Sequence, residues 1–339
     1  MTEPTPLDGV DVLLADLDGV VYAGQTAIAH AVESITAAAN GRRIGYITNN
    51  ASRTAASVAE HLCELGLEVV AHDVVTSPHA AVKLLADLVE PRSTILVIGG
   101  VGLTSVVAAA GFIVTDSAQD APAAVIQGFS PDLGWAHLAE AAFALARDAA
   151  GNGIPWVATN TDWTIPVARG IAPGNGTLVS AVHQAVGILP IVAGKPEVAI
   201  FDEAVRRFGS VSPLFLGDRL DTDILGANRA GMNSVLVFTG IDGPKQLLAA
   251  DKNSRPTFIV GDLRELHEPY PATIIDTVTP GQTRFSVGEA IVLLTGNVVS
   301  LAVAGPKQID VIRAAAAAIW NSGSAIYALD VAPELYSWR

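Results

Sequence analysis

The first 78 residues alternate short apolar runs with helical patterns, and this alternation constrains the fold more than any other feature. An apolar run at Val12–Ala15 precedes a helical pattern from about Ile28 to Ala39. A second run at Ile44–Ile47 precedes a helix predicted from about Ala55 to Leu65. Strands that alternate with helices form right-handed βαβ units and a parallel sheet, and such sheets bind ligands at the carboxyl ends of their strands. The sequence therefore predicts an α/β fold built on a doubly wound parallel sheet.

The first apolar run ends in the sequence Asp16-Leu17-Asp18-Gly19. Side chains alternate across a strand, so Asp16 and Asp18 can face one site, while Gly19 lets the backbone turn sharply. Two carboxylates so close repel each other and need a cation or a proton beside them. An acidic turn after a strand would have the same sequence, so this motif alone supports either interpretation.

Three further polar clusters supply groups that could bind an anion or a cation beside Asp16 and Asp18. Thr48-Asn49-Asn50 offers a hydroxyl and amides to an oxyanion, although Thr and Asn are also common in turns and N-caps. Gly194-Lys195-Pro196 places a lysine at the start of a predicted helix that ends at about Phe208. A cation at the start of a helix is disfavoured unless an anion binds beside it. A solvated lysine is the simpler alternative. Gly217 to Asp223 follows the apolar run Pro213–Leu216 and is rich in aspartate, which suits a hard divalent cation.

In chain order, the motifs DLDG, TNN, GKP and GDRLDTD resemble the four motifs of the haloacid dehalogenase (HAD) superfamily of phosphohydrolases. The resemblance extends over about residues 10 to 262. It implies a Mg²⁺-dependent phosphomonoesterase that forms an aspartyl-phosphate intermediate. Neither of the glycine-rich nucleotide-binding loops, GxxxxGK[ST] or GxGxxG, occurs in a usable context.

The resemblance also implies a role for each motif residue. Asp16 would be the nucleophile and Asp18 the general acid–base. The Asp16 carboxylate, the Asp18 backbone carbonyl and the Asp218 carboxylate would bind Mg²⁺. Asp223 would orient this cluster or bind the metal through a water molecule. The non-bridging phosphate oxygens would be bound by Thr48, Asn49 and Lys195.

An alanine-rich insertion, residues 79–186, separates the second motif from the third. Strands are predicted at Thr94–Gly99, Ala123–Gln127 and Ile154–Thr159, and a helix at Trp135–Ala149. The insertion resembles the C2 cap of the p-nitrophenylphosphatase (NagD-like) branch, which closes over the active site and selects the leaving group. A Pro/Gly-rich loop, residues 173–176, is predicted to lead to a helix that begins near residue 178.

The candidate substrate contacts of this cap lie after its last predicted strand. They are Asn160, Asp162 and Trp163. These residues could instead be turn formers and a buried tryptophan. The resemblance, together with these hydrogen-bonding residues, implies small polyol phosphates, glycerol 3-phosphate foremost, as substrates.

The resemblance divides the chain into four segments: residues 1–78 and 187–263 for the two parts of the HAD core, 79–186 for the cap, and 264–339 for a small C-terminal α+β domain. In the C-terminal domain, residues 269–279 and 284–287 read as strands and residues 290–303 as a hairpin. A helix from Pro306 to about Trp320 and a strand at Ala325–Leu329 complete a pattern that resembles part of an acetyltransferase (GNAT-type) fold. No glycine-rich loop for acyl-CoA is visible, so we expect packing or assembly rather than acetyl transfer.

Composition limits the partners. Half of the 339 residues are hydrophobic, 16% are charged, and the net charge is −14 with no basic block, which argues against nucleic acid and anionic membranes. No apolar run approaches the roughly 18 residues of a membrane span, and no signal peptide is recognisable. We therefore expect no membrane insertion, a cytoplasmic location, Mg²⁺ as cofactor and a small phosphorylated metabolite as partner. Homo-oligomerisation stays open.

Two other functions use the same residues. A phosphotransferase or phosphomutase would keep water away from the aspartyl-phosphate. A non-catalytic phosphometabolite-binding protein would need no nucleophile, and the complete set Asp16, Asp18, Lys195 and Asp218 argues against it.

Overall fold

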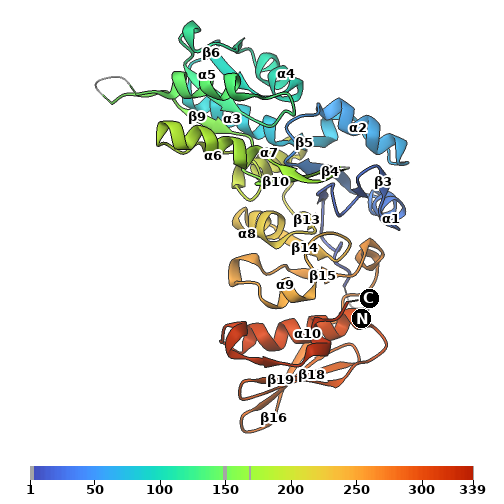
Figure 1. Cartoon of the computed structure of the whole chain (residues 1–339). Coiled ribbons are helices and arrows are strands. Elements are labelled where there is room, and N and C mark those ends of the chain that lie inside the picture. Colours follow the sequence, from blue (N-terminus) through green and yellow to red (C-terminus); the bar gives the residue numbers. More distant parts are fainter. Residues whose placement is uncertain (1–3, 148–150, 168, 339) are drawn as a thin grey trace. The chain divides into compact units, whose positions relative to one another are not determined.

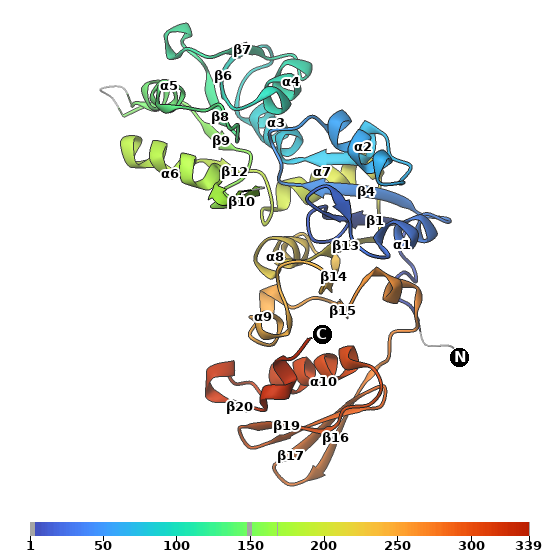
Figure 2. The same ribbon diagram turned by 45° about the vertical axis from the view of Figure 1, so that its right-hand side comes forward.

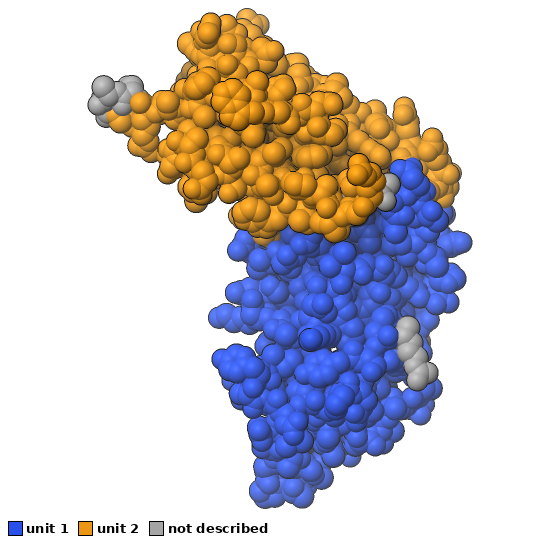
Figure 3. Space-filling model, viewed as in Figure 1, with its two compact units in different colours: residues 1–44, 211–339 blue, residues 45–210 orange. Residues whose placement is uncertain are grey.

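The structure, a computed structural model, describes residues 4–147, 151–167 and 169–338. The chain forms two compact units, residues 1–44 with 211–339 and residues 45–210 (Figure 3). The first unit is therefore built from two stretches of chain that are far apart in the sequence.

The first unit contributes four parallel strands in the order β15–β14–β13–β1 (Figure 1). Their bounds are β1 (Val12–Ala15), β13 (Pro213–Gly217), β14 (Asn233–Val237) and β15 (Phe258–Val260). Most of their residues are buried, as expected for strands of a parallel sheet covered on both faces. Leu14 of β1 lies opposite Phe215 of β13, so the two strands end side by side.

Shorter elements connect these strands: the hairpin β2 (Tyr22–Ala23) and β3 (Thr26–Ala27), α1 (Ala31–Ala38), a π-helical turn (Leu220–Ile224), α8 (Leu225–Arg229) and α9 (Pro244–Leu248). The prediction that the first helix begins near Ile28 is wrong by three residues. The backbone N–H of Ile28 donates to Val21, and His30 has φ 67°, outside the helical range. The helix can therefore begin only at Ala31.

The C-terminal part of the first unit is a sheet with one long helix across a face (Figure 2). Strands β16 (Thr273–Thr279), β17 (Gln282–Val287), β18 (Ala290–Thr295) and β19 (Val298–Val303) are antiparallel neighbours. Helix α10 (Gln308–Asn321) buries most of its residues, among them Ile309, Ile312, Ala316 and Ile319. These side chains share one apolar core with Leu236 of β14, Ile259 of β15 and Leu247 of α9. The segment is thus packed onto its neighbours in the unit.

The predicted strand at Ala325–Leu329 is wrong. This stretch contains a 3₁₀ turn (Ile326–Ala328), followed by the two-residue strand β20 (Asp330–Val331), which pairs in parallel with β19. In a 3₁₀ turn the side chains three residues apart align. Ile326 and Leu329 accordingly both pack on the apolar core, while Tyr327 is 92% exposed.

The buried side chain of Arg313 links α10 to β15 through hydrogen bonds. The Arg313 guanidinium donates to the Ile259 carbonyl from both Nε (2.9 Å) and Nη2 (2.7 Å), and to the carboxylates of Asp310 (2.9 Å) and Glu265 (2.7 Å). It also lies 4.3 Å from the centroid of the Tyr270 ring. At the chain end the Trp338 ring meets Phe238, the residue after β14, edge to face with centroids 5.1 Å apart.

The second unit contains most of β4 (Arg43–Thr48), which pairs in parallel with β5 (Val74–Thr76), and the helices α2 (Ala55–Glu64), α3 (Ser77–Leu88) and α7 (Val198–Phe208). The prediction that Lys195 lies at the start of the last of these helices is wrong. Helix α7 begins at Val198, after the extended residue Glu197, and the Lys195–Pro196 peptide bond is cis. Lys195 therefore lies in the loop before the helix.

Five parallel strands form a second sheet in the same unit, in the order β12–β9–β8–β6–β7. They are β6 (Thr94–Ile98), β7 (Ile113–Thr115), β8 (Ala124–Gln127), β9 (Trp156–Ala158) and β12 (Ile191–Val192). The remaining elements are α4 (Val101–Ala109), α5 (Trp135–Leu145), the hairpin β10 (Thr164–Val167) and β11 (Gly170–Pro173), and α6 (Asn175–Val186). Side chains of α5 and α6 form an apolar core with the sheet.

Two predicted helix ends in this region are wrong. Helix α5 ends at Leu145 because Ala146 is extended (ψ 130°), and residues 148–149 of the prediction lie outside the described residues. Helix α6 begins at Asn175, three residues before the predicted start, directly after extended Gly174.

The predicted class, an α/β fold with parallel sheets, an inserted cap and a C-terminal α+β segment, is confirmed. The predicted domain limits stay a prediction, and α3 runs through the first of them, between residues 78 and 79. Within the described parts of the chain, no helix is both long and apolar enough to cross a bilayer.

Candidate active site

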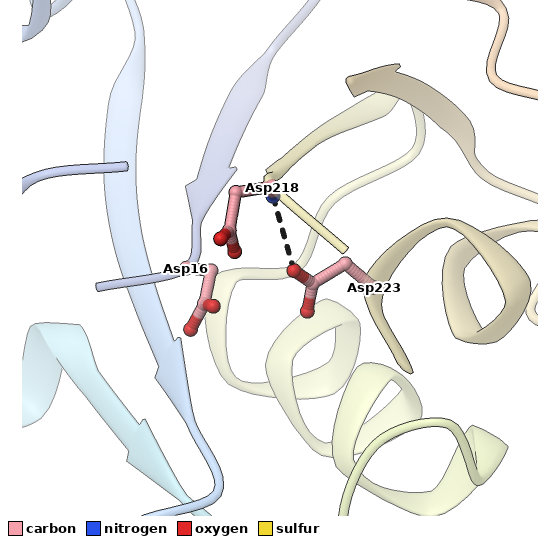
Figure 4. Close-up of side chains that lie close together, drawn as sticks. All are labelled: Asp16, Asp218 and Asp223. Carbon is pink, nitrogen blue, oxygen red and sulfur yellow. Dashed lines mark hydrogen bonds between the residues drawn. The ribbon is translucent and has the colours of Figure 1, made fainter. Parts of the chain in front are cut away.

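Three aspartates of the first unit converge at the carboxyl ends of two neighbouring strands (Figure 4). Asp16 follows β1, Asp218 follows β13, and Asp223 belongs to the π-helical turn after β13. One carboxylate oxygen of each lies within 4.8 Å of the others. Exposed fractions of 8% for Asp16, 1% for Asp218 and 0% for Asp223 show that little solvent reaches them. Such a group of like charges is stable only with a cation or protons between the carboxylates.

Backbone amides fix the orientation of two of these carboxylates. The N–H of Ile241 donates to Asp218 Oδ2 (2.7 Å). Asp223 Oδ2 accepts from the N–H groups of Asp218 (3.1 Å) and Arg219 (3.2 Å). One oxygen of Asp223 is therefore committed to the backbone that carries Asp218, which suits an orienting role.

Glycines surround Asp218 because no side chain fits there. A Cβ on Gly19 or on Gly240 would collide with the Asp218 carboxylate, and Gly19 also has φ +85°, which favours glycine. A Cβ on Gly217 would likewise collide with the Asp223 side chain. Gly19 and Gly217 belong to the motifs found in the sequence, whereas Gly240 does not. The available signal for Gly240 was the pair Thr239-Gly240, one residue after the end of the apolar strand β14.

The loop that contains Gly240 holds the rest of the site together. The Thr239 hydroxyl donates to the Gly19 carbonyl (2.7 Å), and the Leu220 N–H donates to Asp242 Oδ2 (2.7 Å). Burial raises the pKa of Asp242, and nearby negative charges raise it further, against the lowering effect of the Leu220 hydrogen bond. The charges of Asp221 and Asp223 are among those that raise this pKa, so Asp242 lies in a negative electrostatic field.

The donor set fits a hard divalent cation. Asp16, Asp218 and Asp223 offer only oxygen ligands from a buried, glycine-lined cluster, as Mg²⁺ and Ca²⁺ require. Asp18, two residues beyond Asp16, is exposed, and its side chain does not belong to this group of three. An exposed carboxyl group can exchange protons with solvent, which agrees with the expected acid–base role.

The three predicted phosphate-binding residues, Thr48, Asn49 and Lys195, lie in the second unit. Thr48 at the end of β4 is 4% exposed and Lys195 is 5% exposed. The Asn49 side chain and the Lys195 backbone bond reciprocally: Asn49 Oδ1 accepts from Lys195 N–H (2.8 Å) and Nδ2 donates to Lys195 O (3.1 Å). Nδ2 also donates to both oxygens of Asp162 (3.2 Å each). The structure thus brings the second and third motifs together.

The three substrate-contact candidates differ in their surroundings. Asn160 is 4% exposed, and its Nδ2 donates to the Asn49 carbonyl (2.7 Å). Asp162 bonds the Asn49 amide, so both residues contact the second motif. Trp163 is 66% exposed, and the alternative that it is a buried tryptophan is wrong.

Comparison with known proteins defines the class. Residues 13–113 match the haloacid dehalogenase-like hydrolase family, and residues 192–266 match a second family described as HAD-hydrolase-like. Relatives at 41% and 32% identity match 93% and 74% of this chain, over 87% and 95% of their own lengths. The chain belongs to the haloacid dehalogenase-like hydrolase family, as its four motifs predict.

The relatives include the D-glycerol 3-phosphate phosphatase of Mycobacterium tuberculosis, which is 41% identical over 315 residues, 93% of this chain and 87% of the relative. A crystal structure of the glycerol phosphate phosphatase from that organism in complex with magnesium has a TM-score of 0.82 at 39% identity, and covers 97% of this chain and 95% of that one.

Relatives of the expected branch match a smaller part of the chain. The acid sugar phosphatase of Staphylococcus aureus is 32% identical over 74% of this chain and 95% of its own length. The 4-nitrophenylphosphatase of Thermotoga maritima has a TM-score of 0.70 at 28% identity, over 78% of this chain and 98% of its own. The predicted relationship to the p-nitrophenylphosphatase branch is confirmed.

Proposed function

We propose that this protein is a Mg²⁺-dependent phosphoric monoester hydrolase whose substrate is glycerol 3-phosphate. The observation that carries the proposal is the buried group Asp16, Asp218 and Asp223 at the carboxyl ends of β1 and β13. Phosphoryl transfer needs positioned oxygen ligands for a divalent cation beside a nucleophile, and this cluster supplies both. The substrate follows from the relative at 41% identity, a D-glycerol 3-phosphate phosphatase.

Asp16 acts as the nucleophile in this proposal. Its carboxylate attacks phosphorus, the ester P–O bond breaks, and the Asp18 carboxyl group gives its proton to the departing alkoxide. Asp18, now a carboxylate, takes a proton from a water molecule, which attacks the phosphoryl group on Asp16 and releases inorganic phosphate. Asp16, Asp218 and the Asp18 backbone carbonyl would hold Mg²⁺, which would neutralise charge on the phosphoryl oxygens. Asp223 orients Asp218 through its backbone hydrogen bonds.

Thr48, Asn49 and Lys195 bind the other phosphoryl oxygens. Lys195 supplies a positive charge and Thr48 a hydroxyl group. The Asn49 amide already donates to Lys195 and Asp162, so the contact from Asn49 would come from its backbone N–H. The Asn49 side chain would then position Lys195 through its hydrogen bonds to the Lys195 backbone.

Hydrolysis assays with a panel of phosphate monoesters test the proposal. We expect Mg²⁺-dependent release of phosphate, with a higher kcat/KM for glycerol 3-phosphate than for nucleotides or pyridoxal phosphate. Chelation should abolish the activity, and Ca²⁺ should restore little of it because its longer, more numerous contacts disturb in-line geometry. Activity that survives chelation would contradict the metal's role.

The Asp16→Asn variant tests the covalent step. It keeps the size of the side chain but removes the nucleophilic oxygen, so turnover of every ester should stop while the circular dichroism spectrum stays unchanged. A variant that retained one tenth of the wild-type rate, a difference of about 1.4 kcal/mol in barrier, would exclude Asp16 as the nucleophile.

A further inference from the structure

We propose that Asn160 is a positioning residue: it holds the phosphate-binding residues Asn49 and Lys195 in place from the cap and does not contact the substrate's leaving group. The proposal rests on the proposed function and changes the role expected for Asn160 from the sequence. Asn160, Asn49 and Lys195 all belong to the second unit.

The Asn160 side chain is fully used inside the protein. It is 4% exposed; Nδ2 donates to the Asn49 carbonyl (2.7 Å), and Oδ1 accepts from the Asp162 N–H (3.2 Å). The Asn49 carbonyl receives a second hydrogen bond from the Ser77 hydroxyl (2.7 Å). Two donors on one carbonyl oxygen fill both of its acceptor positions, which fixes the peptide that follows Asn49.

This fixed peptide carries a side chain that in turn holds Lys195. Asn49 Oδ1 and Nδ2 bond the N–H and the carbonyl of Lys195 at 2.8 and 3.1 Å. Asp162, two residues after Asn160, accepts from the same Nδ2 and so sets the rotation of the amide. A shift of Asn160 would therefore move Asn49 and Lys195 together.

The loop that carries Asn160 is itself anchored. The Asn175 amide donates to the Asn160 carbonyl (2.7 Å), and the Gly176 N–H donates to the Asp162 carbonyl (2.9 Å). Gly194, directly before Lys195, has no room for a side chain: a Cβ there would lie 2.6 Å from Asn49 Oδ1 and 3.2 Å from Asn160 Cβ. With helix α6 on one side and Gly194 on the other, the loop can act as a rigid support.

Positioning and substrate recognition predict different kinetics. A residue that contacts only the glycerol part matters for glycerol 3-phosphate and little for p-nitrophenyl phosphate, whose leaving group needs scant recognition. A residue that positions the phosphate site affects both esters equally, because both present the same phosphoryl group. It also weakens the binding of inorganic phosphate, which has no leaving group.

The test is the Asn160→Asp variant, which keeps the shape but replaces the donor Nδ2 with an oxygen that faces the Asn49 carbonyl. We expect kcat/KM to fall about 100-fold, the effect of displacing reacting groups by about 1 Å, and by the same factor on both esters. The dissociation constant of inorganic phosphate, measured by calorimetry, should rise. The Mg²⁺ concentration for half-maximal activity should stay unchanged, because Asn160 does not touch the three aspartates.

Two further variants provide a control and a second test of the positioning role. Thr164→Ala, directly after the same loop and with an exposed side chain, is the matched control and should leave p-nitrophenyl phosphate hydrolysis and phosphate affinity unchanged. Ser77→Ala removes the other donor to the Asn49 carbonyl and should give a smaller loss of the same kind. It decides the question if Asn160→Asp fails to fold.

The outcomes separate this proposal from the proposed function. A loss confined to glycerol 3-phosphate, with phosphate affinity intact, would make Asn160 a substrate contact and overturn the positioning role. An unchanged variant would overturn it as well. If the wild-type protein hydrolysed neither ester but bound phosphate less tightly after Asn160→Asp, the proposed function would fail while the positioning role stood.

Discussion

The Asp218 carboxylate occupies the space that a side chain on Gly19 or Gly240 would need. Gly240 is the clearest case, since a Cβ there would overlap the carboxylate, and the N–H of the next residue, Ile241, holds the same group. The metal site therefore depends on glycines, which have no side chain, as well as on its aspartates.

The Gly240→Ala variant should therefore lose activity. The added methyl group must push Asp218 or its own backbone aside, so kcat/KM should fall at least about 100-fold and more Mg²⁺ should be needed for half-maximal activity. Gly243→Ala is the matched control in the same loop, because its Cβ would meet only Gln246 Oε1 at 3.8 Å. Equal activity of the two variants would contradict the tight enclosure of Asp218.

His79 at the start of α3 should make stability depend on pH. Burial, and the charge of Arg207, lower its pKa from 6.5 to about 4, although Glu203 acts in the opposite direction. The unfolded chain therefore binds a proton between these values while the folded protein does not. Stability is full above pH 6.5 and is lost as the pH falls towards 4, by up to roughly 3 kcal/mol.

Urea unfolding at pH 7 and pH 5 measures this effect. The His79→Asn variant keeps an acceptor for the Thr76 N–H, which Nδ1 of His79 binds at 3.2 Å, but cannot be protonated. Its free energy of unfolding should fall less between the two pH values than that of the wild type. A steeper fall would mean that the histidine is charged in the folded protein.

Single residues were predictable where they follow an apolar run. Asp16 and Asp218 come directly after strands, so their position at one sheet edge follows from the parallel arrangement. Gly240 was missed because its contact with Asp218 joins residues that lie apart in the sequence. The hydrogen bond from Asn160 to the Asn49 carbonyl was missed because an asparagine after a strand is also an ordinary turn residue.

At the scale of elements, α10 depends on a buried charge for its place on β15. Arg313 bonds the Ile259 carbonyl, Asp310 and Glu265 with a side chain that is 6% exposed. Removing one partner of a buried pair leaves the other charges without compensation.

Arg313→Met should therefore lower the free energy of unfolding by about 3–5 kcal/mol. The matched control is Arg264→Ala: Arg264 also bonds a carboxylate at 2.7 Å, that of Asp262, but its side chain is 59% exposed. Such a solvent-exposed pair contributes little to stability. Chemical denaturation compares the two variants, and equal losses would mean that burial does not set the strength of the Arg313 contacts.

Sequence patterns located most elements but few of their ends. The runs at β1 and β13 and the helical pattern of α2 agree with the structure to within a residue. The starts of α1 and α7 were misplaced because His30 and Glu197 have backbone conformations that apolar periodicity does not reveal. The strand expected at Ala325–Leu329 failed because two apolar residues three apart also fit a 3₁₀ turn.

At the scale of the whole molecule, the C-terminal segment is part of the first unit's core. Phe285, Val292 and Ile312 belong to the same apolar cluster as Leu236 and Ile259. A chain that ends near residue 264 should expose this surface, and we expect lower solubility or a change in oligomeric state. Any truncated protein that stays soluble should keep Mg²⁺-dependent turnover, because the three aspartates lie outside the segment.

Light scattering and phosphatase assays on the truncated chain check this expectation. The full-length protein should not bind acetyl-CoA, and micromolar binding in calorimetry would contradict a structural role for the segment. A truncated chain that was monodisperse and as stable as the full-length protein would show that the shared core contributes little.

The pairing of β1 with β13 also sets an order of events during synthesis. Val12 lies opposite Pro213, so the strand that ends at Ala15 meets this partner only after about 200 further residues have been made. Ribosomes add about 5–20 residues per second, so this delay lasts roughly 10–40 s. Residues 45–210 are continuous and emerge in between. The edge of β1 that faces β13 therefore stays unpaired for that interval, and an unpaired strand edge can pair with other chains.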